Sequence, residues 1–568
     1  MKLRDLGVLF LASSALACAP PLTLGAAPSL AASSPPPLPA TDAPPPRGLV
    51  RAGTPPAVDI AAARARGGAR SFTWRPWSPE AFAEARRDHK LILLDGAAEW
   101  CHWCHVMDET TYRDAEVGRI LGERFVTIRV DVDEHPDLAE RYGAWGWPAT
   151  IVFSPEAEEL GKYRGFLPTD ELRGLLTELL KATAAAAAPA SLAVAPGDVP
   201  APPAALGWIA GLALVDLDAY YDEEQGGWGH KQKAPLGANA ELEIVRAARG
   251  DAAALARAVF TLQKQRALLD PVWGGVYQYS AGTTWTEPHY EKLMTFQAAN
   301  LEAYARAYAR TGDAALLGDA VGIARYMGTF LSSADGAFLV SQDADAGAHD
   351  ERQTFVDGDV YYRLGDRERR ALGVPRVDDH VYGHENGLAV AAFVTLYEAS
   401  HDPAALARAR LAAGVVQRTL VDADGAVRRT AQGARYLADA ASFGRALARL
   451  AEAMGPSKDG GPYRAAALAV AAAMTRDLAD EATGAFWDRT PDPAAAGVFA
   501  HRTRPFIHNV MAARFFAALG RITGDAAWKE RARRTLAAVC TPRALEERGR
   551  MLGELVLALD EAGAVAWP

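Results

Sequence analysis

The hydrophobic residues follow different patterns in the two parts of the chain. Between residues 72 and 185, short apolar runs such as residues 91–95 and 125–130 alternate with helical stretches, and runs of this length are typical of buried strands. After residue 204 the chain reads as helical segments separated by short turns. The pattern therefore predicts a multidomain protein in which an α/β domain is followed by an all-α domain.

Two kinds of turn alternate along the all-α region. In the first kind a glycine or histidine ends one helix and an aspartate caps the next; these turns are Gly250-Asp251, Gly312-Asp313, His401-Asp402 and Gly524-Asp525. In the second kind a glycine comes just before an aromatic residue or valine; these glycines are Gly227, Gly275, Gly336, Gly425 and Gly484. With a further tight turn at residues 455–461 they give about twelve helices, the last two over residues 526–539 and 543–562. We expect six helical hairpins in a ring, with an α-solenoid as the alternative.

The size and charge of the chain agree with this division. A chain of 568 residues exceeds what one hydrophobic core usually serves. Its 60 basic and 70 acidic residues give a net charge of -10 and form no basic cluster, so nucleic acid is not expected as a partner. We expect a signal peptide, a Pro/Ala-rich disordered tether, the α/β domain, a linker and the all-α domain, over residues 1–17, 18–70, 71–182, 183–204 and 205–568.

The N-terminus has the pattern of an export signal. Lys2 and Arg4 precede an apolar run over residues 6–17 that is too short to span a bilayer and ends in small residues. Cleavage there leaves Cys18 first, as a bacterial lipoprotein requires, although Leu16 stands where a small residue is preferred. We therefore expect a periplasmic or extracellular protein, either lipid-anchored at Cys18 or freely secreted, with a buried N-terminal helix as the remaining alternative.

The segment KLILLDGAAEWCHWCH carries the chemistry of the α/β domain. Its apolar half predicts a buried strand, and Cys101 and Cys104 follow where a helix begins. A thiolate in the first turn of a helix faces unpaired backbone N–H groups and the positive end of the helix dipole. We therefore expect Cys101 to be the exposed, attacking thiol and Cys104 to be the shielded, resolving one. The chain has 4 cysteines in all, and Cys540 lies in an apolar helix end typical of the core.

The same segment resembles known families. LLDGAAEWCHWC is similar to the active-site segment of thioredoxins, and CHWCHVMDETTYRD with VDVDEHPDL downstream resembles the spermatogenesis-associated protein 20 family, also called DUF255. The resemblance covers roughly residues 70–350. It implies a thioredoxin-like domain joined to a six-hairpin glycosidase-like (α/α)6 toroid, which agrees with the order of elements predicted from the turns.

The resemblance also implies roles for two residues outside the cysteine motif. In the thioredoxin fold a proline at the entry to the next strand is cis and faces the two sulfurs, and Pro148 in WGWPATIVF matches it. Asp95 stands six residues before Cys101, as does the buried acid of thioredoxins that accepts a proton from the resolving thiol. The alternative for Asp95 is a residue at the end of the strand that caps the next turn.

Two other chemistries fit the residues of the motif. C-x-x-C-H, from Cys101 to His105, is also the attachment motif of c-type haem. His102 and His105 together with the two thiolates could bind zinc or copper. Because a strand precedes the motif and the proline pattern follows it, we favour redox chemistry and expect no cofactor and no metal.

The toroid supplies a second set of candidate residues. They are aromatic, imidazole and carboxylate side chains in segments that resemble motifs of the family: Trp228, Trp285, His289, Glu291, Asp343 and Asp345. We expect them at the rim of the toroid, with His289 and Glu291 at the start of a helix whose first turn holds Pro288. Aromatic rings beside carboxylates suit a carbohydrate, by stacking, hydrogen bonding and acid–base chemistry. The alternative is that the aromatic residues fill the mouth of the toroid and the acids cap helices.

The sequence therefore favours an exported thiol-disulfide oxidoreductase. Its expected partner is a redox protein or a disulfide substrate of the cysteine pair, and the toroid is expected to bind a ligand, with carbohydrate as a candidate. The alternative function is a carbohydrate-active enzyme or sugar-binding protein of the six-hairpin glycosidase class, in which the thioredoxin-like domain is structural. Contact with a membrane is expected only through a lipid anchor at Cys18.

Overall fold

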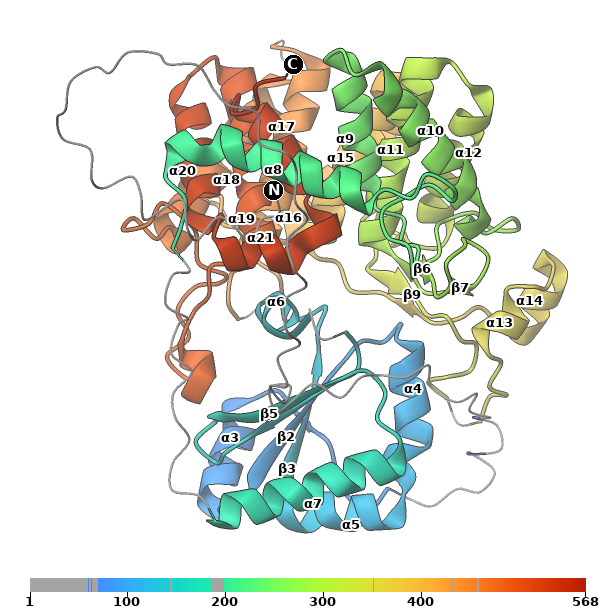
Figure 1. Ribbon diagram of the computed structural model, residues 1–568, viewed down its shortest axis with the longest axis vertical. Helices are drawn as coiled ribbons and strands as arrows, with labels where there is room; N and C mark the ends of the chain where they lie inside the picture. The colour runs from blue at the N-terminus through green and yellow to red at the C-terminus, as the bar shows by residue number, and fades with distance from the viewer. Residues whose placement is uncertain are drawn as a thin grey trace, which may run out of the picture.

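The structure, a computed structural model, has an α/β domain and an all-α domain that pack against each other (Figure 1). The residues that it describes are Ile60, Ala63, 70–143, 146–185, 199–350, 352–430, 433–456 and 459–567. The expected signal peptide, most of the tether and most of the linker lie outside these residues and stay predictions. Among the described helices, none combines the length and the apolar character that crossing a membrane requires.

The α/β domain is built on one sheet of five strands in the order β1-β3-β2-β4-β5. The strands are β1 (Arg75–Pro76), β2 (Leu91–Ala97), β3 (Phe125–Asp131), β4 (Ala149–Phe153) and β5 (Glu159–Arg164). β2 pairs with β3 in parallel and with β4 in antiparallel orientation, and Leu94 lies opposite both Ile128 and Ile151. The strands predicted from the apolar runs are thus confirmed.

Five helices cover the two faces of this sheet. They are α3 (Pro79–Asp88), α4 (His102–Glu109), α5 (Ala115–Arg124), α6 (Pro136–Tyr142) and α7 (Thr169–Ala185). Side chains alternate along a strand, so Ile92 and Leu94 of β2 pack in the cluster of α3 and α6, whereas Leu93 packs in the cluster of α5 and α7. β2 is buried on both faces over its whole length, and it leads directly into the loop that carries the first cysteine.

Twelve long helices form two concentric rings in the described part of the all-α domain. The inner ring consists of α9 (Gly237–Ala248), α11 (Met294–Thr311), α15 (Gly383–Ser400), α17 (Leu437–Met454), α19 (Phe506–Thr523) and α22 (Gly553–Glu561). The outer ring consists of α8 (Leu206–Tyr220), α10 (Ala252–Gln265), α12 (Ala314–Thr329), α16 (Pro403–Thr419), α18 (Gly461–Leu478) and α20 (Ala527–Val539). Each inner helix packs on the next, α22 packs back on α9, and each outer helix packs on one inner helix. The ring therefore closes, which confirms the (α/α)6 toroid and excludes the solenoid.

The prediction of one continuous helix over residues 543–562 is wrong. The chain forms α21 (Pro542–Arg548), a short 3-10 turn and then α22. Gly549 at the break has a φ of 45°, a left-handed conformation that an α-helix does not accommodate. Shorter elements that the turns did not predict, including β7 (Pro288–His289), β8 (Lys292–Leu293), β9 (Ser341–Gln342), α13 (Gly358–Tyr361) and α14 (Asp366–Leu372), lie in the loops of one rim.

The two kinds of turn lie at opposite rims of the toroid and have the design that the sequence indicated. Asp313, for example, accepts a hydrogen bond from the N–H of Ala315 at 2.9 Å, while Gly312 before it has a φ of 68°. At the other rim, amide side chains of inner helices fix the loops that follow the outer helices. Gln297 both accepts from the N–H and donates to the carbonyl of Val276, at 2.7 Å each. This pairing fixes the loop around Val276 to the inner helix α11.

The two domains share a packed interface. Phe499, in the loop before α19, inserts into the core of the α/β domain, where its ring lies 4.7 Å from that of Trp77 and 5.8 Å from that of Phe82. Arg489 of the toroid lies 3.0 Å from the carboxylate of Asp137 in α6. The α/β domain is therefore held in a fixed orientation, with α4 turned toward the toroid loops that follow β9 (Figure 1).

Candidate redox site at the domain interface

Cys101 and Cys104 form a disulfide at the start of α4. The two sulfurs are 2.09 Å apart. Cys101 is the N-cap residue of α4, and its sulfur accepts a hydrogen bond from the backbone N–H of Cys104 at 3.2 Å. The positive end of the helix dipole also lies there, so the geometry favours negative charge on the sulfur of Cys101 once the disulfide is reduced.

The exposure of the two cysteines differs from the expectation. Only 3% of the surface of Cys101 and 5% of that of Cys104 is accessible, so the prediction that Cys101 is exposed is wrong. Trp147 of the α/β domain and Leu293 of the toroid both pack against the apolar cluster that contains the cysteines. The docked toroid therefore covers a thiol pair that would lie at the surface of a free-standing domain of this fold.

Asp95 is buried, as the thioredoxin resemblance implied, whereas the expectation that Pro148 faces the two sulfurs stays a prediction. The peptide bond between Trp147 and Pro148 is cis. Asp95 lies within β2 rather than at its end, so the expectation that it caps a turn is wrong. Its Oδ2 accepts from Nε of Arg129 at 2.9 Å and its Oδ1 accepts from the hydroxyl of Tyr112 at 3.2 Å. Burial raises the pKa of Asp95 although Arg129 opposes it, and its role as a proton acceptor stays a prediction.

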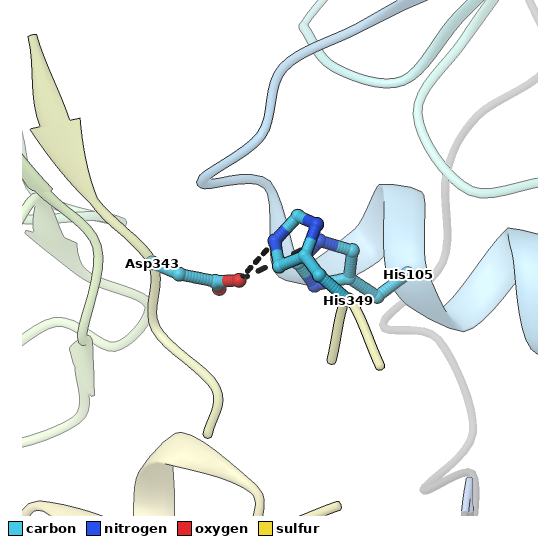
Figure 2. A group of neighbouring side chains, drawn as sticks. All are labelled: His105, Asp343 and His349. Atoms are coloured by element: carbon cyan, nitrogen blue, oxygen red, sulfur yellow. Dashed lines mark hydrogen bonds and ion pairs between the residues drawn. The ribbon is translucent and has the colours of Figure 1, made fainter. Parts of the chain in front are cut away.

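Two histidines of α4 meet two aspartates of the toroid. Nδ1 of His102 lies 2.7 Å from Oδ2 of Asp345, and Nδ1 of His105 lies 3.5 Å from the same oxygen. Burial alone lowers the pKa of His102, but the carboxylate of Asp345 outweighs it and raises the pKa to about 9. Asp343 and His349 extend this cluster, as Figure 2 shows: Nε2 of His349 lies 2.8 Å from Oδ2 of Asp343. Asp343 and Asp345 thus contact α4, the helix that begins at the cysteine pair.

A cavity of about 550 Å³ lies on one side of α4, between the two domains. Its walls include His102 and Trp103 from α4 and His289, Tyr290, Glu291 and Asp345 from the toroid. Glu291 is buried, and its Oε2 has no hydrogen-bond partner among the described residues. Burial raises the pKa of this carboxyl to about 7, while burial lowers the pKa of His289 to about 4. A neutral imidazole and a carboxyl poised near neutrality therefore share one cavity.

Three expectations about the rim residues are wrong. Trp228 and Trp285 are packed into the hydrophobic core and do not line this cavity. Nε1 of Trp285 donates to the carbonyl of Gln225 at 2.8 Å, so its polar atom is used inside the loop. His289 belongs to strand β7, and the helix begins only at Met294, because the segment around Pro288 pairs with residues 279 and 280 instead of forming a first helical turn. Trp103 and Tyr290 supply the aromatic walls.

A second cavity, of about 400 Å³, lies against the resolving cysteine. It is lined by Cys104 and His105 together with Glu99, Asp108, Arg129 and His349 among others. Cys101 lines neither this cavity nor the one next to His102. The cavity thus brings solvent space to Cys104 rather than to the residue at the helix start.

Comparison with known proteins supports the fold of the N-terminal part. Residues 67–186 match the family model described as "Protein of unknown function, DUF255". The chain is 31% identical over 308 residues to spermatogenesis-associated protein 20 from Homo sapiens. The aligned region covers 48% of this chain and 39% of the human protein. It is 33% identical over 95 residues to thioredoxin-1 from Drosophila melanogaster, covering 17% of this chain and 84% of the thioredoxin. The resemblance inferred from the cysteine motif is therefore confirmed.

A solved structure also resembles the toroid. Cellobiose 2-epimerase from Spirochaeta thermophila aligns with a TM-score of 0.45 and 14% sequence identity, covering 58% of this chain and 84% of the epimerase. The chain spans 39% of the human relative, so the activity of that whole protein is not transferred to it. The chemistry of this chain rests on its own residues.

Proposed function

We propose that the protein catalyses thiol–disulfide exchange through Cys101 and Cys104. The observation that carries the proposal is the position of the pair at the first turn of α4, where the N–H of Cys104 donates to the sulfur of Cys101 at 3.2 Å. A thiolate released at Cys101 is stabilised there by this hydrogen bond and by the helix dipole. The similarity to thioredoxin-1 over 95 residues supports the same chemistry.

The cavities favour attack by the substrate at Cys104 rather than at Cys101. A substrate thiolate that enters the cavity of about 400 Å³ meets Cys104 and attacks its sulfur. A bond forms between the substrate and Cys104, the bond between the two cysteines breaks, and its electron pair leaves with Cys101 as a thiolate. A second substrate thiolate then attacks the substrate sulfur of the mixed disulfide, and Cys104 leaves and takes up a proton. Two substrate thiols are oxidised to one disulfide, and the cysteine pair is reduced by two electrons; the reverse sequence reduces a disulfide.

The burial of Cys101 and Cys104 limits which kinds of substrate can reach them. Leu293 and Trp147 cover the cysteines, so the flat surface of a folded protein does not reach them in this arrangement. We infer that the substrate is a low-molecular-weight thiol or disulfide, or an extended cysteine-containing segment, rather than a disulfide on a rigid protein surface.

Two single-cysteine variants test the proposal. Each of C101S and C104S is incubated with glutathione disulfide, and the mixed disulfide is followed by intact-protein mass spectrometry. We expect C101S, which keeps Cys104, to form the mixed disulfide at least several times faster than C104S, because Cys104 lines the cavity. Failure of both variants to react would exclude exchange at this pair, and a faster reaction of C104S would reverse the proposed order of attack.

The other cavity favours a second candidate function, the binding or conversion of a carbohydrate. The supporting observation is Glu291, whose buried Oε2 lacks a hydrogen-bond partner among the described residues and whose carboxyl has its pKa raised to about 7 by burial. With Trp103 and Tyr290 in the walls, the cavity offers a ring surface together with an acid–base group. Calorimetric titration with glucose, mannose and cellobiose tests it: binding that E291Q loses supports this function, and no binding by the wild type contradicts it.

We also propose that the chain is exported, on the basis of its N-terminal pattern. The residues concerned, 1–17, lie outside the described part of the structure. N-terminal mass spectrometry of protein recovered from a bacterial envelope fraction should give a chain that begins at Cys18, with or without lipid. Full-length protein that stays in the cytosol would contradict export.

A further inference from the structure

We propose that His105, Asp343 and His349 form a binding site for a divalent transition-metal ion between the two domains (Figure 2). His105 comes from the redox helix α4, whereas Asp343 and His349 come from the toroid loop that follows β9. Two imidazole nitrogens and one carboxylate oxygen are a donor set that zinc and iron(II) use in proteins. The site differs from the thiol-based one that the sequence allowed, because it uses neither cysteine.

The three donor atoms are spaced as metal ligands are. Oδ2 of Asp343 lies 2.8 Å from Nε2 of His349 and 3.7 Å from Nε2 of His105. All three donor atoms lie within 4.8 Å of one another. Ligand atoms bound at about 2.0–2.1 Å in a tetrahedral arrangement lie roughly 3.3–3.4 Å apart, so each of the two distances to Asp343 differs from that spacing by only about half an ångström.

His105 carries the observation that points to a ligand. The residue is only 9% exposed, yet its Nε2 has no hydrogen-bond partner among the described residues. At 3.7 Å the carboxylate of Asp343 is too far away for a hydrogen bond. A buried polar nitrogen without a partner is costly unless something binds it, and an ion between Asp343 and His349 would satisfy it.

The surrounding contacts orient the donors. Nδ1 of His105 faces Oδ2 of Asp345 at 3.5 Å, the arrangement in which a carboxylate holds a metal-binding imidazole with its other nitrogen toward the ion. Oδ1 of Asp343 accepts from the N–H of Asp345 at 2.9 Å, which leaves Oδ2 directed at the two histidines. The rings of His105 and His349 stand edge to face, 4.8 Å apart. The site is thus preorganised from both domains.

Three protein ligands leave a coordination position open. His105 and His349 both line the cavity of about 400 Å³, so the open position faces solvent space. An ion held in this way can bind water or an oxygen- or sulfur-containing ligand from the cavity, as ions in catalytic zinc sites do. Because the ligands belong to both domains, the ion would also bind the folded interface and not the unfolded chain.

The test is a titration of the chelator-treated protein with zinc, and with cobalt as a spectroscopic probe. We expect one ion per chain, a higher melting temperature with zinc, and a visible cobalt spectrum without thiolate charge-transfer bands. C101S/C104S should bind like the wild type, which separates this proposal from the thiol chemistry. D343N and H349A should lose the ion, and D345N, which removes the partner of His105, should bind about 10–100-fold more weakly.

A matched control uses a histidine–aspartate pair elsewhere. His230 lies 3.6 Å from Asp222, but its side chain is 61% exposed, so H230A should bind zinc like the wild type. The melting temperature of each metal-free variant shows whether it is folded. Binding that survives in folded D343N and H349A, or that needs the cysteines, would overturn the proposal. Loss of the ion in H102A alone would overturn it as well, because it would place the ion in the neighbouring group of His102, Asp345 and Asp357.

Discussion

Nδ1 of His102, the first residue of α4, lies 2.7 Å from Oδ2 of Asp345 in the toroid. The side chain of Asp345 is fully buried and that of His102 is 18% exposed, so the ion pair is largely shielded from solvent. The helix that positions the disulfide is therefore anchored by a residue 243 positions further along the chain. Access to the thiol pair and the docking of the two domains are thus physically linked.

Removing this anchor should destabilise the interface. In D345N the two histidines of α4 lose their buried carboxylate, and breaking a buried pair by removing one partner costs about 3 kcal/mol or more. We expect a lower melting temperature in calorimetry and a faster reduction of the disulfide. D350N is the control, because Asp350 belongs to the same loop but makes a surface pair with Arg352, whose loss should leave the melting temperature nearly unchanged. Equal effects of the two substitutions would contradict the anchoring role.

Leu293 should control how fast the disulfide reacts. This toroid side chain packs against the cluster of the two cysteines, and L293A removes part of that cover. We expect dithiothreitol to reduce Cys101–Cys104 several times faster in L293A than in the wild type, followed by alkylation and mass spectrometry. L406A, which shortens a partly buried leucine on outer helix α16, should not change the rate. An unchanged rate in L293A would mean that the toroid does not limit access.

Glu291 should make stability depend on pH. Burial raises its pKa from 4.5 to about 7 in the folded protein, so folding favours the protonated carboxyl. The contribution of Glu291 to the free energy of unfolding is fully present below about pH 4.5 and is lost as the pH rises through 7. The full contribution is about 3 kcal/mol. Between pH 5 and pH 8, the melting temperature of the wild type should therefore fall more than that of E291Q. E123Q, on an exposed face of α5, should follow the wild type, and parallel curves for all three proteins would contradict burial of an ionisable Glu291.

Phe499 should hold the α/β domain in place. F499A removes a buried ring that packs against Trp77 and Phe82, and substitutions of this kind cost about 3–5 kcal/mol. We expect a separate, earlier unfolding transition of the α/β domain in calorimetry, together with faster reduction of the disulfide. F260A, at a partly exposed position on α10, should leave both unchanged. A single transition at the wild-type temperature would show that this contact does not determine docking.

Local signals in the sequence predicted much of the fold. The run before Cys101 forms β2, which is buried on both faces, and Asp251, Asp313 and Asp402 cap the helices that follow three of the tight turns. Both features were predictable because they depend on neighbours within a few residues. The count of about twelve helices followed from the turns alone, whereas the closure of the ring is shown by the packing of α22 on α9. The helix boundary at Gly549 was missed, since a single glycine within a helical pattern gives no firm boundary in a sequence.

The composition of the site could not be predicted in the same way. The cysteines and their place at a helix start were evident, but the burial of Cys101 depends on Leu293 in another domain. Asp343 and Asp345 were assigned to a ligand pocket, and no local pattern indicated that they meet His102 and His105. His349 carried no signal at all. Trp228 and Trp285 resembled ligand-stacking residues, yet an aromatic side chain in a loop serves the core equally well.

The most direct test of the account is the reduction potential of the Cys101–Cys104 pair. The oxidised protein is equilibrated in glutathione buffers of graded potential, and the free thiols are trapped and counted by mass spectrometry. Because the N–H of Cys104 and the helix dipole stabilise a thiolate at Cys101, we expect a reversible two-electron transition above about -300 mV, the limit below which structural disulfides lie. A disulfide that stays intact in buffers below about -300 mV would be structural, and would contradict a redox function for this protein.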